Sequence, residues 1–216
     1  MKQCLLVLAA AIGLVSACSN SNGGGDSADR RFRPSDLSPF DSLCMQFNQM
    51  SPPLGLYAMI DYSLDTLAEL GPAQIALLPP LLEIEDLVGD NGLHYFALCQ
   101  MNLGEHIALL YCVISEVGYR TLIATFDKEG NPIDQIVFNG ERFDYCQIDG
   151  FLSKELTLTT TQTCYDPHPS ETGKLLADQV VLTYQFKNGG FHLADKHGYP
   201  GRTMCFSAET RVVDCP

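Results

Sequence analysis

Residues 119–138 read YRTLIATFDKEGNPIDQIVF and hold the clearest structural signal in the chain. Tyr119–Phe126 and Ile133–Phe138 are rich in β-branched and aromatic residues, which favour strands. Between them, Lys128-Glu129-Gly130 has the form of a three-residue hairpin loop with Gly130 in the left-handed position. This stretch therefore predicts two antiparallel strands joined by a tight turn.

The sequence on both sides of this hairpin continues the same pattern. Turn signals such as Val117-Gly118, Asn139-Gly140 and Asn188-Gly189-Gly190 separate further β-rich runs. The other expected strands are Tyr95–Met101, Ile107–Ile114, Phe143–Ile148, Phe151–Thr163, Leu175–Phe186, Phe191–Leu193 and Met204–Phe206. Because no long helix separates them, we expect an antiparallel β meander over residues 93–216, arranged as a sandwich or a curved sheet.

Residues 36–92 are less clearly patterned and predict a short helical or irregular segment in front of the β domain. Ser63 can cap a helix that begins near Asp65, has acidic residues in its first turns, and ends at Gly71. Pro72 can open a second turn, and Pro79-Pro80 stops whatever follows. The expected fold class is therefore mainly β with a small helical N-terminal segment.

The first residues have the features of an export signal. Lys2 gives a positive start, and Leu5–Val15 is an apolar run too short to span a bilayer as a helix. The run ends in Val15-Ser16-Ala17-Cys18, which resembles the lipobox of bacterial lipoproteins. The resemblance implies removal of residues 1–17, a lipid thioether on the sulfur of Cys18, and acylation of the new amino terminus.

Residues 18–35 are expected to carry the lipid and to form a flexible tether. Ser19–Ser27 contains no apolar residue and three consecutive glycines, which is typical of a linker. Several acyl chains anchor a protein stably where one chain does not. We therefore expect an exported protein of the cell envelope, an outer-membrane lipoprotein that faces the periplasm or the cell surface.

The hairpin supports the same origin. Residues 119–134, with the turn Asp127-Lys128-Glu129-Gly130-Asn131 and the following Ile133-Asp134, resemble a hairpin common in uncharacterised lipoproteins of Bacteroidota. There, this hairpin begins a β meander. The resemblance implies a fold and a source, and it implies no activity.

Composition limits the classes of partner. With residues 1–17 removed from the 216, 199 residues remain, with 12 basic and 26 acidic side chains, because Lys2 is lost; the net charge is −14. Nucleic-acid binding needs a basic surface, so DNA and RNA are excluded as expected partners. An acidic surface would suit a basic protein partner.

Seven cysteines remain for the folded part, and no two of them are spaced Cys-x-x-Cys. A terminal hairpin that pairs Ser207 with Val213 would place Cys205 opposite Cys215, close enough for a disulfide. A turn that pairs Met101 with His106 would leave Cys99 too far from Cys112 to bridge. We therefore predict a Cys205–Cys215 bond and no Cys99–Cys112 bond.

Motifs for chemistry are weak. Asp127-x-Glu129-Gly130-Asn131 suggests a calcium loop, but its glycine and acidic residues do not fall at the EF-hand positions. His192 and His197, with Asp195 between them, lack a third ligand for a metal. We identify no catalytic residue and expect neither a metal nor a cofactor.

Two functions remain open from the sequence. The preferred one is a non-enzymatic, lipid-anchored β module, either structural or binding another envelope or extracellular protein. The alternative is an envelope hydrolase whose site is assembled from loops. Its best candidate is the polar loop Tyr165–Glu171, which contains His168 and two prolines.

Overall fold

The computed structural model describes residues 37–56, 67–81, 92–142, 145–166, 174–206 and 212–215. The predicted signal segment 1–17, Cys18 with its tether, the start of the helix predicted from Ser63, and His168 lie outside the described residues. No helix of the described part is both long and apolar enough to cross a membrane.

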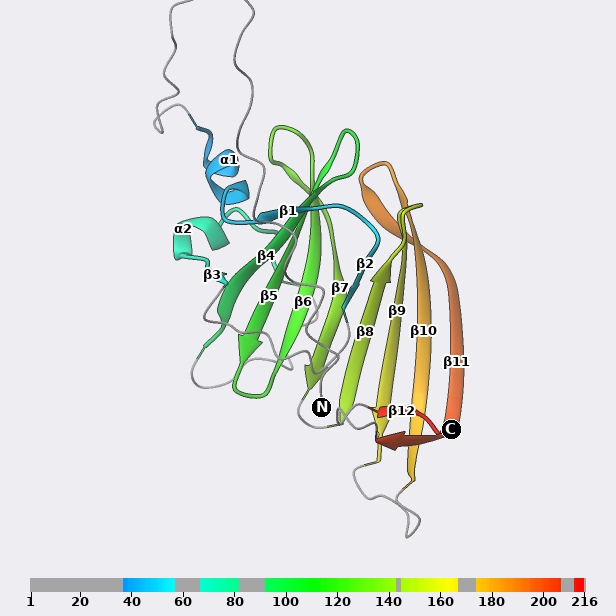
Figure 1. Ribbon diagram of the computed structural model, residues 1–216. Coiled ribbons are helices and arrows are strands. Elements are labelled where there is room, and N and C mark those ends of the chain that lie inside the picture. The colour runs from blue at the N-terminus through cyan, green and yellow to red at the C-terminus, as the bar shows by residue number, and fades with distance from the viewer. Residues whose placement is uncertain are drawn as a thin grey trace, which may run out of the picture. The chain divides into compact units, whose positions relative to one another are not determined.

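The described strands form one sheet, which is not closed (Figure 1). In chain order they are β1 (Asn48–Met50), β2 (Leu54–Leu56), β3 (Ala68–Glu69), β4 (His94–Asn102), β5 (Ile107–Ser115), β6 (Gly118–Phe126), β7 (Pro132–Arg142), β8 (Cys146–Leu152), β9 (Thr157–Tyr165), β10 (Leu175–Lys187), β11 (Gly190–Phe206) and β12 (Val212–Asp214). Strands β4 to β12 follow one another in the sheet as they do in the chain, and each pairs antiparallel with the next. The predicted mainly β meander is confirmed.

Strand β1 makes the sheet mixed. It pairs in parallel with β4, and Asn48 lies opposite Cys99. β3 pairs with β4 as well, antiparallel, and β2 pairs with β8. Short strands from the N-terminal segment thus extend the sheet. The sequence predicted only helical or irregular structure for this segment and no strands.

The β6–β7 hairpin has the predicted position. Its loop closes with a hydrogen bond from the Gly130 N–H to the Asp127 carbonyl, and Gly130 has a φ of 88°. A Cβ on Gly130 would also lie 2.4 Å from Cγ of Phe40, so the ring packs directly over the turn. Glycine is therefore required there by both the backbone conformation and the space.

Three predicted boundaries within the meander are wrong. β7 continues through Asn139-Gly140, where we predicted a turn, and a bulge opposite Thr121 and Leu122 takes up the extra residue. The run Phe151–Thr163 is divided between β8 and β9 by a turn at Ser153–Leu156. The two short strands expected around Phe191 and Met204 are parts of β11, which has 17 residues.

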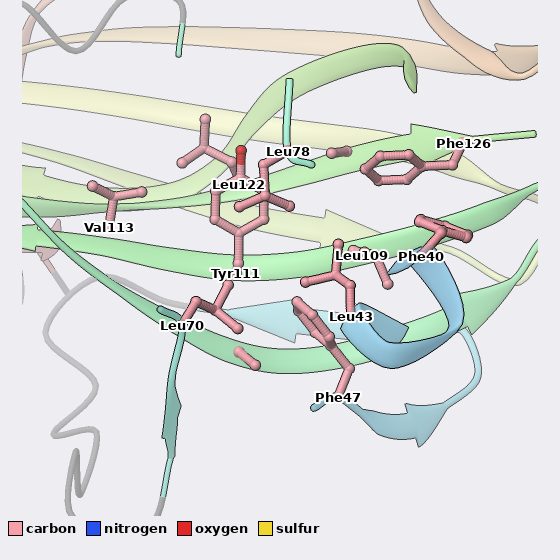
Figure 2. Packing of buried hydrophobic residues seen from close by; sticks show 12 residues of the cluster. Phe40, Leu43, Phe47, Leu70, Leu78, Leu109, Tyr111, Val113, Leu122 and Phe126 are labelled. Atoms are coloured by element: carbon pink, nitrogen blue, oxygen red, sulfur yellow. The ribbon is translucent and has the colours of Figure 1, made fainter. Parts of the chain in front are cut away.

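Strands β4 to β6 are covered on both faces. On one face, the short helices α1 (Pro39–Cys44) and α2 (Pro72–Ile75) cover a core (Figures 1 and 2). Its buried members include Phe40, Leu43, Phe47, Leu70, Leu78, Leu109, Tyr111, Val113, Leu122 and Phe126. On the other face, side chains of β4 to β7 meet those of β8, β9 and the β10–β11 hairpin, among them Met101, Leu110, Ile123, Phe138, Leu152, Leu158 and Phe191. Consequently every residue of β6 is buried.

Helix α1 begins with a complete capping box. The Ser38 hydroxyl accepts a hydrogen bond from the Asp41 N–H, and the Asp41 carboxylate accepts one from the Ser38 N–H. This helix lies within the segment 36–92 that was expected to be helical or irregular, but its position was not predicted. The sequence analysis placed a helix from Asp65 to Gly71 instead, and for Ala68–Glu69 that prediction is wrong, because these two residues form β3 against β4.

The disulfides join Cys205 to Cys215 and Cys146 to Cys164. The first is the predicted pair, but the predicted register is wrong: Cys205 lies opposite Val213, and Phe206 opposite Val212. The second was not predicted, and its two cysteines are direct partners across β8 and β9. Cys44, Cys99 and Cys112 are free thiols.

The register around Cys99 also differs from the prediction. Met101 lies opposite Ala108 instead of His106, and a bulge follows at Ala97–Cys99. Cys99 consequently faces Leu110, whereas Cys112 faces Phe96.

β11 is the longest strand, and much of it is uncovered. Its residues from His192 to Pro200 are exposed without interruption, although side chains of a strand point alternately to its two faces. This stretch pairs with β10 on one edge, and β12 covers the other edge at Met204–Phe206.

Candidate functional site

Strand β7 has a free edge over much of its length. Toward β6 it is paired from Pro132 to Arg142. Toward β8, among the described residues, pairing is confined to Gly140–Arg142, opposite Cys146–Ile148. Further along, β8 pairs with β2 instead, and Figure 1 shows β2 beside β8 where β7 departs. The outer edge of residues 132–137 thus has no partner strand in the described part of the chain. At Phe138 and Asn139 the edge lies against β8, because Asn139 Nδ2 donates to the Ile148 carbonyl and a Cβ on Gly150 would lie 1.9 Å from the Phe138 carbonyl oxygen.

Three hollows follow this edge one after another. They have volumes of about 350, 260 and 250 Å³. The first two share Asp134 and Gln135, and the last two share Ile136, Val137 and Tyr184. We call these hollows together the β7 groove; its other lining residues are Pro79, Pro80, Arg120, Leu122, Pro132, Ile133, Ile148, Thr160, Gln162, Leu182 and Phe191.

Asp134 connects the two strands that meet at the groove. Its Oδ1 accepts a hydrogen bond of 2.9 Å from the Gln135 N–H, and its Oδ2 accepts one of 2.6 Å from the Phe191 N–H at the start of β11. A carboxylate that accepts from main-chain N–H groups makes stronger hydrogen bonds than a neutral acceptor does. Asp134 therefore fixes the distance between β7 and the β10–β11 hairpin.

Gln135 places an acceptor in the same region. Its amide nitrogen donates to the phenol oxygen of Tyr111 in the core. Its amide oxygen is buried and accepts no hydrogen bond from any described residue. Buried polar atoms are nearly always satisfied, so this oxygen can accept a hydrogen bond from a further group.

Arg120 lies at the far end of the groove. Only 7% of the residue is exposed, and its Nη1 donates to the Tyr119 carbonyl at 3.0 Å. A Cβ on Gly140, the opposite residue on β7, would lie 2.7 Å from Cδ of Arg120. Glycine at this position therefore allows the arginine stem to pass over β7.

A fourth hollow, of about 450 Å³, lies beside the Cys146–Cys164 disulfide. It is lined by Tyr165 and Asp166, the first residues of the loop that we considered for a hydrolase. Burial raises the pKa of Tyr165, and the nearby charges of Glu141 and Tyr145 add to this effect. His168 of that loop lies outside the described residues. The described residues of the loop, Tyr165 and Asp166, do not form a pair of nucleophile and base.

The described histidines are distributed over the molecule. His94 Nδ1 lies 2.9 Å from Oε1 of Glu69, and His197 Nε2 lies 2.8 Å from Oδ2 of Asp195. His192 Nε2 lies 3.1 Å from the Lys187 carbonyl instead. Within the ranges that the structure describes, no three His, Cys, Asp or Glu side chains are placed to hold a metal ion.

The β7 groove was not found from the sequence. One signal for it is present, because Asp134 and Gln135 are adjacent polar residues inside the otherwise apolar strand Ile133–Phe138. Comparison with protein-family models, with curated proteins and with solved structures found no match to this chain.

Proposed function

We propose that this protein is a lipid-anchored module of the bacterial cell envelope, held to the membrane through Cys18, which binds another envelope or extracellular protein through the β7 groove. The observation that carries the proposal is the line of hollows along a strand edge that lacks a partner in the described residues. Strand edges present main-chain donors and acceptors that a second polypeptide can use.

The division of the groove into three adjoining hollows suits an extended polypeptide better than one compact ligand. Pockets for small ligands usually have volumes of about 300–1,000 Å³ and enclose most of the ligand. The three hollows have volumes of 350, 260 and 250 Å³ and are arranged in a row. An extended chain segment can occupy all three with successive side chains.

The remaining features support an envelope module. Cys18 and the tether would place the folded part near a membrane and leave it free to reach a partner. The charge of −14 after removal of residues 1–17 would attract basic proteins. The two disulfides are typical of an oxidising compartment outside the cytoplasm.

Site-specific photo-crosslinking in living cells tests the proposal. A photoreactive residue would replace Ile133 in the groove, which is 43% exposed, or Leu193 on β11, which is 56% exposed and serves as the control. We expect a protein adduct of discrete mass from position 133 and none from position 193. No adduct from position 133, or the same adducts from both positions, would contradict binding through the groove.

A further inference from the structure

We infer that the partner binds by strand addition: an extended segment of it pairs antiparallel with the outer edge of β7, with apolar residues in its middle and basic residues at the end nearest Pro132. This inference rests on the proposed function and adds the binding mode and the chemistry of the bound segment.

The direction of the main-chain groups follows from Gln135. Its N–H donates to the carboxylate of the preceding residue, Asp134, and therefore points away from β6; this N–H is already satisfied and does not pair with an added strand. Alternate residues of a strand direct their N–H and C=O groups to the same edge. Val137 accordingly directs its N–H outward as well, and Ile136 directs its N–H toward β6.

The edge is long enough for a short strand. Residues Ile133 to Val137 span about 13–17 Å at roughly 3.3 Å per residue. Added strands of three to five residues are within the usual range of strand lengths. The bulge near Asn139 and the pairing with β8 that begins at Gly140 limit the edge at one end, and the turn before Pro132 limits it at the other.

The walls of the groove favour apolar side chains in alternate positions. Pro79 and Pro80 line the first hollow, Phe191 and Tyr184 the second, and Tyr184 and Leu182 the third. Side chains at alternate positions of an added strand lie on one face and would reach these hollows in turn. The buried oxygen of Gln135 adds an acceptor for an N–H group of the same segment.

Local charge defines the direction of the segment. Near Pro132 lie Asp134 and the turn residues Asp127 and Glu129, and Lys128 of that turn is bound to Glu105. Arg120 lies at the opposite end of the groove. Basic residues of the partner therefore fit at the Pro132 end. In an antiparallel pairing, which is slightly more stable than a parallel one, that end is the C-terminal end of the segment.

The test uses the full chain in detergent and a synthetic peptide, acetyl-Val-Thr-Val-Thr-Val-Lys-Lys-amide. We expect binding with a Kd below roughly 1 mM, and at least about tenfold weaker binding when both lysines are replaced with glutamates. Amide exchange measured by NMR should slow by about tenfold or more at Val137 on peptide binding and stay unchanged at Ile136. Absence of binding at roughly 1 mM peptide would overturn the inference.

Two variants isolate the main-chain hydrogen bond. Val137→Pro removes the outward N–H, which an edge strand tolerates, and Val137→Thr retains it. The proline variant should lose peptide binding at least about tenfold while the threonine variant binds normally, with both variants folded by circular dichroism. Equal binding by the two variants, or peptide binding without protection of Val137, would refute strand addition. A crosslink at position 133 would still support the proposed function in that case, so the two failures are distinguishable.

Discussion

The contact between Gly130 and Phe40 can be tested by replacing the glycine with alanine. The added methyl group would lie 2.4, 2.6 and 2.8 Å from Cγ, Cβ and Cδ1 of Phe40. Distances this short are repulsive, and these atoms are close to the helix backbone, so the ring has to move as a whole. Phe40 is 6% exposed and packs against Phe126 with 4.9 Å between ring centroids. Movement of the ring therefore disturbs the core shown in Figure 2.

Two effects contribute to the expected loss of stability. Alanine at a φ of 88° costs about 1–2 kcal/mol, because its Cβ crowds the following carbonyl in the left-handed region. Complete removal of a buried phenylalanine side chain costs about 3–5 kcal/mol, and a displaced ring loses about a third to a half of that. We therefore expect Gly130→Ala to lower the free energy of unfolding by about 2–4 kcal/mol.

A double-mutant cycle separates the two effects. In a Phe40→Ala background there is no ring to displace, so Gly130→Ala should cost only about 1–2 kcal/mol there. Urea unfolding with both disulfides intact, followed by far-UV circular dichroism, measures all four proteins. The chain has no tryptophan, so tyrosine fluorescence serves as the second probe. Additive effects of the two substitutions would refute the packing of Phe40 over the turn.

Further predictions concern the anchor, a buried hydrogen bond, a buried thiol and a disulfide. Cys18→Ser should abolish fatty-acid labelling and detergent partitioning; a variant that still labels would contradict the lipid anchor. The Thr125 hydroxyl donates to the Gly189 carbonyl at 2.5 Å, so Thr125→Val should cost about 1–3 kcal/mol in urea unfolding while Thr125→Ser costs less, and equal losses would contradict this role. Burial raises the pKa of Cys112 from 9.0 to about 12, so the neutral thiol stabilises the fold fully below pH 9 and this stability is lost as pH rises toward 12. Above pH 9, the free energy of unfolding of Cys112→Val should therefore fall less steeply with pH than that of the unchanged protein, by up to about 1.4 kcal/mol per pH unit. The same dependence on pH in both proteins would argue against a buried thiol. Non-reducing peptide mapping should recover the Cys146–Cys164 crosslink, and alkylation of either cysteine in unreduced protein would show that the bond is missing.

The local parts of the fold were predictable from the sequence, and the parts that depend on distant residues were not. The β6–β7 hairpin was found because Gly130 and its neighbours specify the turn by their own conformational preferences. Asn139-Gly140 has equally strong turn preferences. The pairing of Gly140 with both Arg120 and Ile148 nevertheless keeps it inside a strand. Neither partner is adjacent in the chain, so local patterning could not reveal them.

The N-terminal segment shows the same limit. Ser38, Pro39 and Asp41 are a recognisable helix start, but the helix after them has six residues, too few for an apolar period to be visible. The acidic residues before Gly71 favoured a helix, and β4 instead provides hydrogen bonds that hold Ala68–Glu69 as a strand. Short elements of this kind obtain their structure from the sheet on which they lie.

The groove itself could not be predicted, because it depends on where strand pairing ends. Asp134 and Gln135 were visible as polar residues in an apolar strand, but their significance depends on Phe191 and Tyr111. These two residues belong to β11 and β5, and contacts over such separations require the three-dimensional arrangement. The Cys146–Cys164 bond was missed for a related reason, because the turn at Ser153–Leu156 that aligns the two cysteines was not recognised.

The exposed stretch of β11 bears on whether copies of the protein aggregate. Long exposed strand edges promote aggregation, since they can pair with an identical edge on a neighbouring molecule. Two copies that met antiparallel around Lys196 would place two ammonium groups opposite each other, and a register around Asp195 would do the same with two carboxylates. Pro200 cannot donate a hydrogen bond in any register. The composition of β11 thus opposes edge-to-edge pairing between copies of the chain.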